Sequence, residues 1–340
     1  MKGNWIKVET LLSPCPRSRA SLAYDHGSKS VILFGGLVDR HGMNDTWSFD
    51  GTHWSELTPR TRPSPRHSSP MTWSPLGSHL VLLNGVASQP VGGGSSRPGT
   101  SMDNLHDTWV FDGQNWVSQR SKYPDYSQQA LATDLASGLV VAFGGLRAHP
   151  RTLIGLLFPK NPGQSSLLDE TWVYDGNDWK QISMDARPPG RNFAGMTSHT
   201  DGRGVVLFGG QGNTRGAADN LHDTWVFDGQ NWEEIPSLSS PGPRLGMLVA
   251  HDPIIGRTVL FGGRRRVNQD SQEDLNDTWV FDGQNWEQVR TPTAPSPRAW
   301  AAMTFDAMNG QIVLFGGTRG PGFSADPLDE TWILVIEVDD

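Results

Sequence analysis

The chain has 340 residues, 36% of them hydrophobic, and a formal net charge of −8, so it can bury a core but lacks the basic balance of a nucleic-acid-binding protein. It contains 39 Gly and 24 Pro, which predicts many turns, and it has no apolar run long enough to cross a membrane. Its single cysteine, Cys15, excludes an internal disulfide framework and favours a reducing, cytoplasmic location. We therefore expect no nucleic-acid or membrane partner.

The first predicted element is a short strand at residues 4–8, which contains Trp5. From about residue 17 onward the chain is a repeat. Each unit has an apolar run such as Val31-Ile32-Leu33-Phe34, a Gly-Gly or Asn-Gly pair, an acidic residue with Thr-Trp, a turn and a second tryptophan. Short β-branched and aromatic segments bounded by glycine predict strands. The Thr-Trp tryptophans are Trp47, Trp109, Trp172, Trp225, Trp279 and Trp332, and the second tryptophans are Trp54, Trp116, Trp179, Trp232 and Trp286.

Six registered copies of this pattern resemble the kelch motif over nearly the whole chain. The resemblance implies an all-β, six-bladed kelch-type β-propeller with four-stranded antiparallel blades around a central channel. The last copy lacks its second tryptophan, and residues 4–8 have the sequence of that missing strand. We therefore predict a single domain over residues 1–340, closed by the N-terminal strand, in which residues 4–8 complete the blade formed by about 298–335.

The unequal lengths of the loops indicate which face of the propeller binds a ligand. In an antiparallel meander, the loops after the second and fourth strands of each blade emerge on one face. The two longest insertions, at about Val86–Leu105 and Leu146–Leu168, follow second strands, and the latter contains the apolar run Leu153–Phe158. Since loops on a rigid scaffold carry most binding residues, we expect a protein or small-molecule ligand on this long-loop face.

One residue repeats near the start of each first strand: Arg17, Arg66, Tyr126, Arg191, Arg244 and Arg298. Five guanidinium groups around one channel mouth would bind an anion. The alternative is structural, because an arginine at this place is common in kelch repeats and each could pair with the acidic residue before Thr-Trp.

The residues just after this position differ between repeats, as a purely structural position should not. They predict a mixed polar and aromatic rim typical of a small-molecule pocket. The alternative for Trp300 is a plug in the channel, whereas Trp73 aligns with Tyr24 and Phe305 and is predicted to lie in the core. The predicted rim residues are Arg19, His67, Gln128, Asn192, Phe193 and Trp300.

Motifs of common enzyme classes are missing: the sequence has no His-Glu-x-x-His, no Gly-x-Ser-x-Gly and no phosphate-binding P-loop. His106 and His222 occupy matched positions before Asp-Thr-Trp, where turn capping explains them better than metal ligation. We expect no cofactor and no metal. Two functions stay open: a recognition scaffold, which we favour, and a cofactor-independent isomerase, mutarotase or lyase with His67 as its base.

Overall fold

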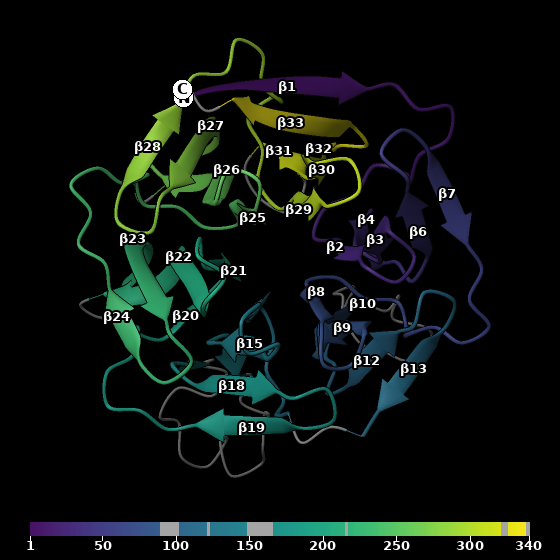
Figure 1. Cartoon of the computed structure of the whole chain (residues 1–340), viewed down its shortest axis with the longest axis horizontal. Coiled ribbons are helices and arrows are strands. Elements are labelled where there is room, and N and C mark those ends of the chain that lie inside the picture. The colour runs from purple at the N-terminus through teal and green to yellow at the C-terminus, as the bar shows by residue number, and fades with distance from the viewer. Residues whose placement is uncertain are drawn as a thin grey trace.

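Six blades surround a central channel (Figure 1). The computed structural model describes residues 1–88, 102–120, 123–147, 166–214, 217–268, 270–320 and 326–337. In each blade four antiparallel strands run from the channel outward in chain order, with one exception at the sixth blade. The predicted all-β, six-bladed fold is confirmed.

The strands of the first three blades are short. Blade one contains β2 (Ser21–Asp25), β3 (Ser30–Phe34), β6 (Thr46–Phe49) and β7 (Trp54–Leu57). Blade two contains β8 (Met71–Ser74), β9 (His79–Leu83), β12 (Thr108–Phe111) and β13 (Trp116–Gln119). Blade three contains β14 (Ala130–Thr133), β15 (Val140–Phe143), β18 (Thr171–Tyr174) and β19 (Trp179–Ile182).

The fourth and fifth blades have longer middle strands. Blade four contains β21 (Gly195–Ser198), β22 (Val205–Thr214), β23 (Ala217–Phe227) and β24 (Trp232–Glu234), with β20 (Arg191–Asn192) also paired to β22. Blade five contains β25 (Leu248–Asp252), β26 (Arg257–Arg266), β27 (Gln272–Phe281) and β28 (Trp286–Val289). Blade six contains β29 (Ala302–Asp306), β30 (Gln311–Phe315), β33 (Thr331–Glu337) and β1 (Lys2–Val8).

Small ribbons extend the second and third strands toward the long-loop face. In blades four and five they are continuous with β22–β23 and β26–β27, beyond a shift in register after Phe208 and Phe261. In the other blades they are separate pairs: β4 (Leu37–Val38) with β5 (His41–Gly42), β10 (Val86–Ser88) with β11 (Met102–Asn104), β16 (Leu146–Arg147) with β17 (Ser166–Leu167), and β31 (Thr318–Arg319) with β32 (Asp326–Pro327).

The N-terminal strand closes the ring, as predicted. β1 pairs antiparallel with β33 in an unbroken register from Lys2 opposite Glu337 to Val8 opposite Thr331. Figure 1 shows β1 along the outer edge of β33. The blade is therefore shared between the two ends of the chain, and its sheet order is β1-β33-β30-β29.

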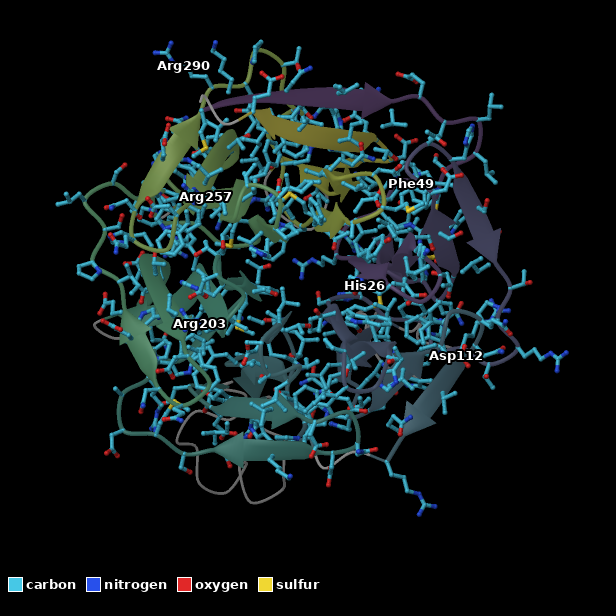
Figure 2. The ribbon with its side chains drawn as sticks, viewed as in Figure 1. His26, Phe49, Asp112, Arg203, Arg257 and Arg290 are labelled. Atoms are coloured by element: carbon cyan, nitrogen blue, oxygen red, sulfur yellow. The ribbon has the colours of Figure 1, made fainter. Side chains whose placement is uncertain are left out.

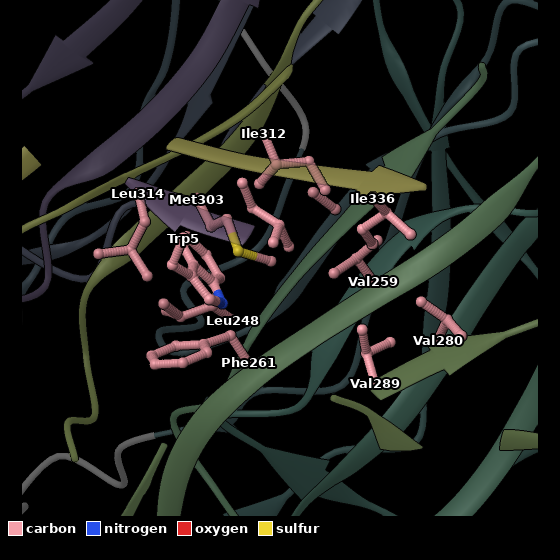
Figure 3. Packing of buried hydrophobic residues seen from close by; sticks show 12 residues of the cluster. Trp5, Leu248, Val259, Phe261, Val280, Val289, Met303, Ile312, Leu314 and Ile336 are labelled. Atoms are coloured by element: carbon pink, nitrogen blue, oxygen red, sulfur yellow. The ribbon is translucent and has the colours of Figure 1, made fainter. Parts of the chain in front are cut away.

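The second tryptophan of each repeat links neighbouring blades. Its indole N–H donates to the hydroxyl of the Thr-Trp threonine in the preceding blade, which satisfies a polar group that would otherwise be buried alone. In blade six Trp5 packs against Phe261 of blade five, with ring centroids 5.0 Å apart (Figure 3). The six bonds are Trp5–Thr278 at 3.0 Å, Trp54–Thr331 at 2.8 Å, Trp116–Thr46 at 3.0 Å, Trp179–Thr108 at 3.1 Å, Trp232–Thr171 at 2.9 Å and Trp286–Thr224 at 2.9 Å.

Candidate functional site at the long-loop mouth

The five repeated arginines lie inside the blades, each no more than 2% exposed. In blade one, Arg17 Nη1 and Nη2 donate to the two carboxylate oxygens of Asp45 at 2.7 and 2.8 Å, and Trp47 Nε1 donates to the same carboxylate at 2.7 Å. Arg17 also donates to the Gly35 carbonyl. Each of these guanidinium groups is paired with a carboxylate inside its blade, as the structural alternative predicts. The other four pairs are Arg66–Asp107, Arg191–Asp223, Arg244–Asp277 and Arg298–Glu330.

In blade three Tyr126 stands in place of the arginine, and Arg147 supplies the positive charge. Tyr126 Oη donates to Glu170 Oε2 at 2.7 Å, and Arg147 donates to Tyr126 Oη and to Glu170. Burial and the hydrogen bond to Glu170 raise the pKa of Tyr126 to about 12. Tyr126 therefore has the same structural place as the arginines.

Backbone hydrogen bonds between neighbouring blades surround the channel mouth. In five blades the donor is the residue two positions after the repeated arginine. We call the six equivalent residues, one per blade, the mouth ring. The Arg19 N–H donates to Trp300 at 2.7 Å, Ser68 to Arg19 at 3.0 Å, Phe193 to Gln128 at 3.1 Å, Gly246 to Phe193 at 3.3 Å and Trp300 to Gly246 at 3.0 Å. All six backbones are left-handed, with φ between 53° and 62°: Arg19, Ser68, Gln128, Phe193, Gly246 and Trp300.

This shared backbone explains why the side chains can differ. A left-handed non-glycine residue costs on the order of 1 kcal/mol or more and persists where its surroundings over-determine it, as bonds between blades do here. The scaffold thus specifies the main chain of the ring and leaves its side chains to another role.

Three side chains of the mouth ring gather over the channel. The guanidinium carbon of Arg19 lies 4.4 Å from the ring centroid of Trp300 and 5.4 Å from that of Phe193. The Phe193 and Trp300 rings meet edge to face, with centroids 4.6 Å apart. Burial, and secondarily the charge of Arg264, lower the pKa of Arg19 to about 10, so the group stays cationic at neutral pH. The mouth therefore carries a cation held between aromatic rings.

Of the remaining predicted rim residues, His67 and Asn192 are buried and Gln128 is partly exposed. His67 is 3% exposed and its Nδ1 lies 3.0 Å from Ser68 Oγ. Burial and the charge of Arg19 lower the pKa of His67 to about 3, which makes its imidazole a weak base at neutral pH. Asn192 Nδ2 donates to Gln128 Oε1 at 2.7 Å, which joins blades three and four at the rim.

Behind the mouth ring lies a cavity of about 230 Å³. Its lining includes small residues such as Ala20, Ala194 and Ala301, together with Gln129. Gln129 is 5% exposed, and neither atom of its amide has a hydrogen-bond partner among the described residues. Both amide atoms are buried, so this amide is not presented to the cavity.

An apolar girdle forms the floor of this cavity. One residue from each blade lines both this cavity and a second one on the opposite side of the propeller. The girdle residues are Leu22, Met71, Leu131, Met196, Val249 and Met303.

Sequence reasoning missed Gln129 and the buried pair of Arg264 and Asp274. Arg264 Nε donates to Asp274 Oδ1 at 2.6 Å, and Gly320 N–H donates to Asp274 Oδ2 at 2.8 Å, which ties blade five to blade six beside the mouth. The run of three arginines from Arg264 was the available signal. The apolar run Leu153–Phe158 lies outside the described residues.

Other candidate chemistry is limited in the described ranges. They contain no group of three or more His, Cys, Asp or Glu side chains that could hold a metal ion. Cys15 is a free, exposed thiol. No helix in the part of the chain that the structure describes is long and apolar enough to cross a membrane.

The fold and the repeated contacts define a kelch-type propeller, and comparison with known proteins gives its family. A profile of the KLHDC2/KLHL20/DRC7 Kelch-repeats domain matches residues 160–338. The chain belongs to this kelch-repeat family.

Curated relatives share part of the chain. An F-box/kelch-repeat protein of Arabidopsis thaliana is 34% identical over 190 residues, which is 50% of this chain and 37% of that protein. Dynein regulatory complex subunit 7 of Chlamydomonas reinhardtii is 27% identical over 168 residues, 48% of this chain and 12% of that protein. Putative adagio-like protein 2 of Oryza sativa subsp. japonica is 24% identical, over 97% of this chain and 51% of that protein. The chain thus spans about half or less of these three relatives.

A solved structure described as "Structure of YjhT" has the same fold. It covers 95% of both chains with a TM-score of 0.66 and 14% sequence identity. This likeness concerns the fold.

Proposed function

We propose that this chain is a recognition module that binds a segment of a partner protein at the long-loop mouth of its channel. One observation carries the proposal: six positions with the same left-handed backbone carry six different residue types. A position held by backbone bonds alone has no structural need for Arg19, Phe193 and Trp300, yet these three side chains meet over the channel.

The chemistry of the mouth favours a segment with an acidic or carbonyl group. Arg19 keeps its positive charge in a poorly hydrated place, where an anionic group gains more than it would in water. Trp300 supplies the large rigid contact area that recurs in binding hot spots.

The names of two relatives also support a protein partner. One is named for an F-box with kelch repeats and another for a subunit of a regulatory complex. The enzymatic alternative receives less support, because His67 is buried and its pKa of about 3 leaves little basicity for proton abstraction.

The test compares partner capture by the wild type and by mouth variants. Arg19→Asn and Trp300→Gly keep residue types that tolerate left-handed backbone, so folding should survive. We expect each variant to weaken binding of the captured partner about tenfold or more in purified form. Ile254→Ala, on the opposite face, is the control and should leave affinity unchanged. Equal affinity in all three folded variants would refute the proposal.

A further inference from the structure

The opposite end of the channel contains a second cavity, of about 390 Å³. We call it the turn-face chamber, because it opens among the short turns that join the first and second strands. It shares only the apolar girdle with the cavity at the long-loop mouth. Figure 2 shows His26 beside the central channel, and this residue lies at the rim of the chamber.

Aromatic side chains form one continuous side of the chamber. The Tyr24 and His26 rings meet edge to face with centroids 4.9 Å apart, and the His26 and Trp73 rings are 5.2 Å apart at 45°. Phe305 adds a ring from blade six. Trp73 and Phe305 are half-buried: each packs against a core cluster, as predicted for Trp73, and each also lines the chamber.

Buried carboxylates stand behind this aromatic side. Asp25 and Asp306 end the first strands of blades one and six and are 2% and 0% exposed. Each accepts a backbone N–H from its own turn at 3.1 Å. Burial raises the pKa of the Tyr24 phenol, and the charges of Asp306 and Asp25 raise it further, which places both carboxylates within electrostatic reach of that ring.

The described lining of the chamber contains no lysine or arginine. Burial lowers the pKa of His26, against the attraction of Asp25, and burial also lowers the pKa of His251 to about 4. Burial therefore favours the uncharged form of both imidazoles, and the lining carries no fixed positive charge that would repel a cation.

We propose that the turn-face chamber is a second binding site, which takes an alkylated ammonium group against Trp73 and Phe305. Aromatic faces attract such cations, and the attraction is largest where water is excluded. The apolar girdle suits N-methyl groups and offers nothing to a strongly hydrated metal ion. The same ammonium chemistry occurs in small quaternary amines and in methylated lysine side chains.

The first experiment compares choline with its uncharged carbon isostere, in which a tert-butyl group replaces the trimethylammonium. Binding is followed by NMR of methionines labelled at the methyl carbon, because three girdle residues are Met71, Met196 and Met303. We expect choline to shift these signals with at least about tenfold higher affinity than the isostere. Equal affinities, or no shift with choline, would overturn the proposal.

Variants locate the cation. Trp73→Leu removes a π face but keeps apolar bulk, and it should weaken choline binding about five- to tenfold. Trp73→Phe keeps the π face and should lose less than about threefold. Trp300→Gly, at the other mouth, should bind choline like the wild type. An unchanged affinity in Trp73→Leu would overturn the site, and Phe305→Leu repeats the test should Trp73→Leu fail to fold.

A third arm distinguishes the two sources of the ammonium group. A peptide with one trimethyllysine is compared with free choline and with the same peptide carrying unmodified lysine. Tighter binding of the trimethyllysine peptide than of choline identifies a partner chain as the source, whereas tighter binding of choline identifies a small molecule. If neither binds, the chamber is not a cation site, while the proposal for the long-loop mouth is unaffected.

Discussion

Replacing Trp5 with alanine tests how strongly the N-terminal strand holds the ring closed. The indole of Trp5 is 1% exposed and donates its N–H to Thr278 of blade five. Truncation of a buried tryptophan costs about 3–5 kcal/mol. The stranded hydroxyl of Thr278, which is also buried, adds about 1 kcal/mol. We therefore expect the free energy of unfolding to fall by about 4–6 kcal/mol.

This loss translates into a modest shift of the thermal midpoint. With an unfolding entropy of about 2.1 cal/mol/K per residue over 340 residues, 1 kcal/mol corresponds to about 1.4 °C. The expected fall in Tm is therefore about 6–8 °C, measured by calorimetry or by circular dichroism in the far ultraviolet. Deletion of residues 1–9 removes the whole strand and should lower Tm further.

Trp232→Ala is the matched control. Trp232 is 2% exposed, donates to Thr171 at 2.9 Å and packs against Phe143 at 5.1 Å, so it makes the same contacts at the junction of blades three and four, which does not involve the N-terminal strand. The two variants should lose similar stability. If Trp232→Ala lowered Tm as expected and Trp5→Ala lowered it by less than about 2 °C, β1 would not belong to the cooperative ring.

Three further outcomes follow from the blade contacts. Gly246→Ala should cost about 1–3 kcal/mol in urea denaturation, because the φ of Gly246 is +60° and a Cβ would lie 2.7 Å from the Trp300 ring; an unchanged midpoint would contradict this. Arg66→Met should cost about 2–4 kcal/mol in the same assay, since it leaves a half-buried carboxylate without its partner, and a loss below about 1 kcal/mol would refute the structural role. Burial alone would raise the pKa of Glu330, but hydrogen bonds led by that from Arg298 outweigh it and lower the pKa to about 2. Because this folded pKa is depressed, the stabilisation by Glu330 is complete above about pH 4.3 and is lost as the pH falls toward 2. The Tm values of wild type and Glu330→Gln should therefore converge in that range. A constant difference between the two Tm values would contradict this reasoning.

The repeat predicted the blades because each copy has the same partners. The second tryptophan and the Thr-Trp threonine recur at fixed spacing since they bond to each other across every blade junction, Trp116 to Thr46 for example. Closure by residues 4–8 was predictable for the same reason, because Thr278 needed a second tryptophan as its partner and Trp5 supplies it. Contacts that recur at every blade junction require residues that recur at a fixed spacing in the sequence.

The candidate site was only partly predictable. Variation after the repeated arginine drew attention to Arg19, Phe193 and Trp300, whose side chains contact one another in the structure. The sequence could not say whether Arg17 points into its blade or into the channel, because that depends on the path of the strand. Trp73 packs against the core as predicted, but the sequence could not show that it also lines the turn-face chamber, because the repeat pattern does not give the position of a side chain relative to the channel.

The apolar girdle forms a boundary common to the two cavities of the channel, because its six residues line both of them. Its Leu, Met and Val side chains offer no strong hydrogen-bonding group to water or to ions. This boundary can deform, because Met71, Met196 and Met303 are flexible side chains. A ligand that displaces these side chains from one cavity reduces the room in the other. Occupants of the two cavities should therefore weaken each other's binding, each by the same factor.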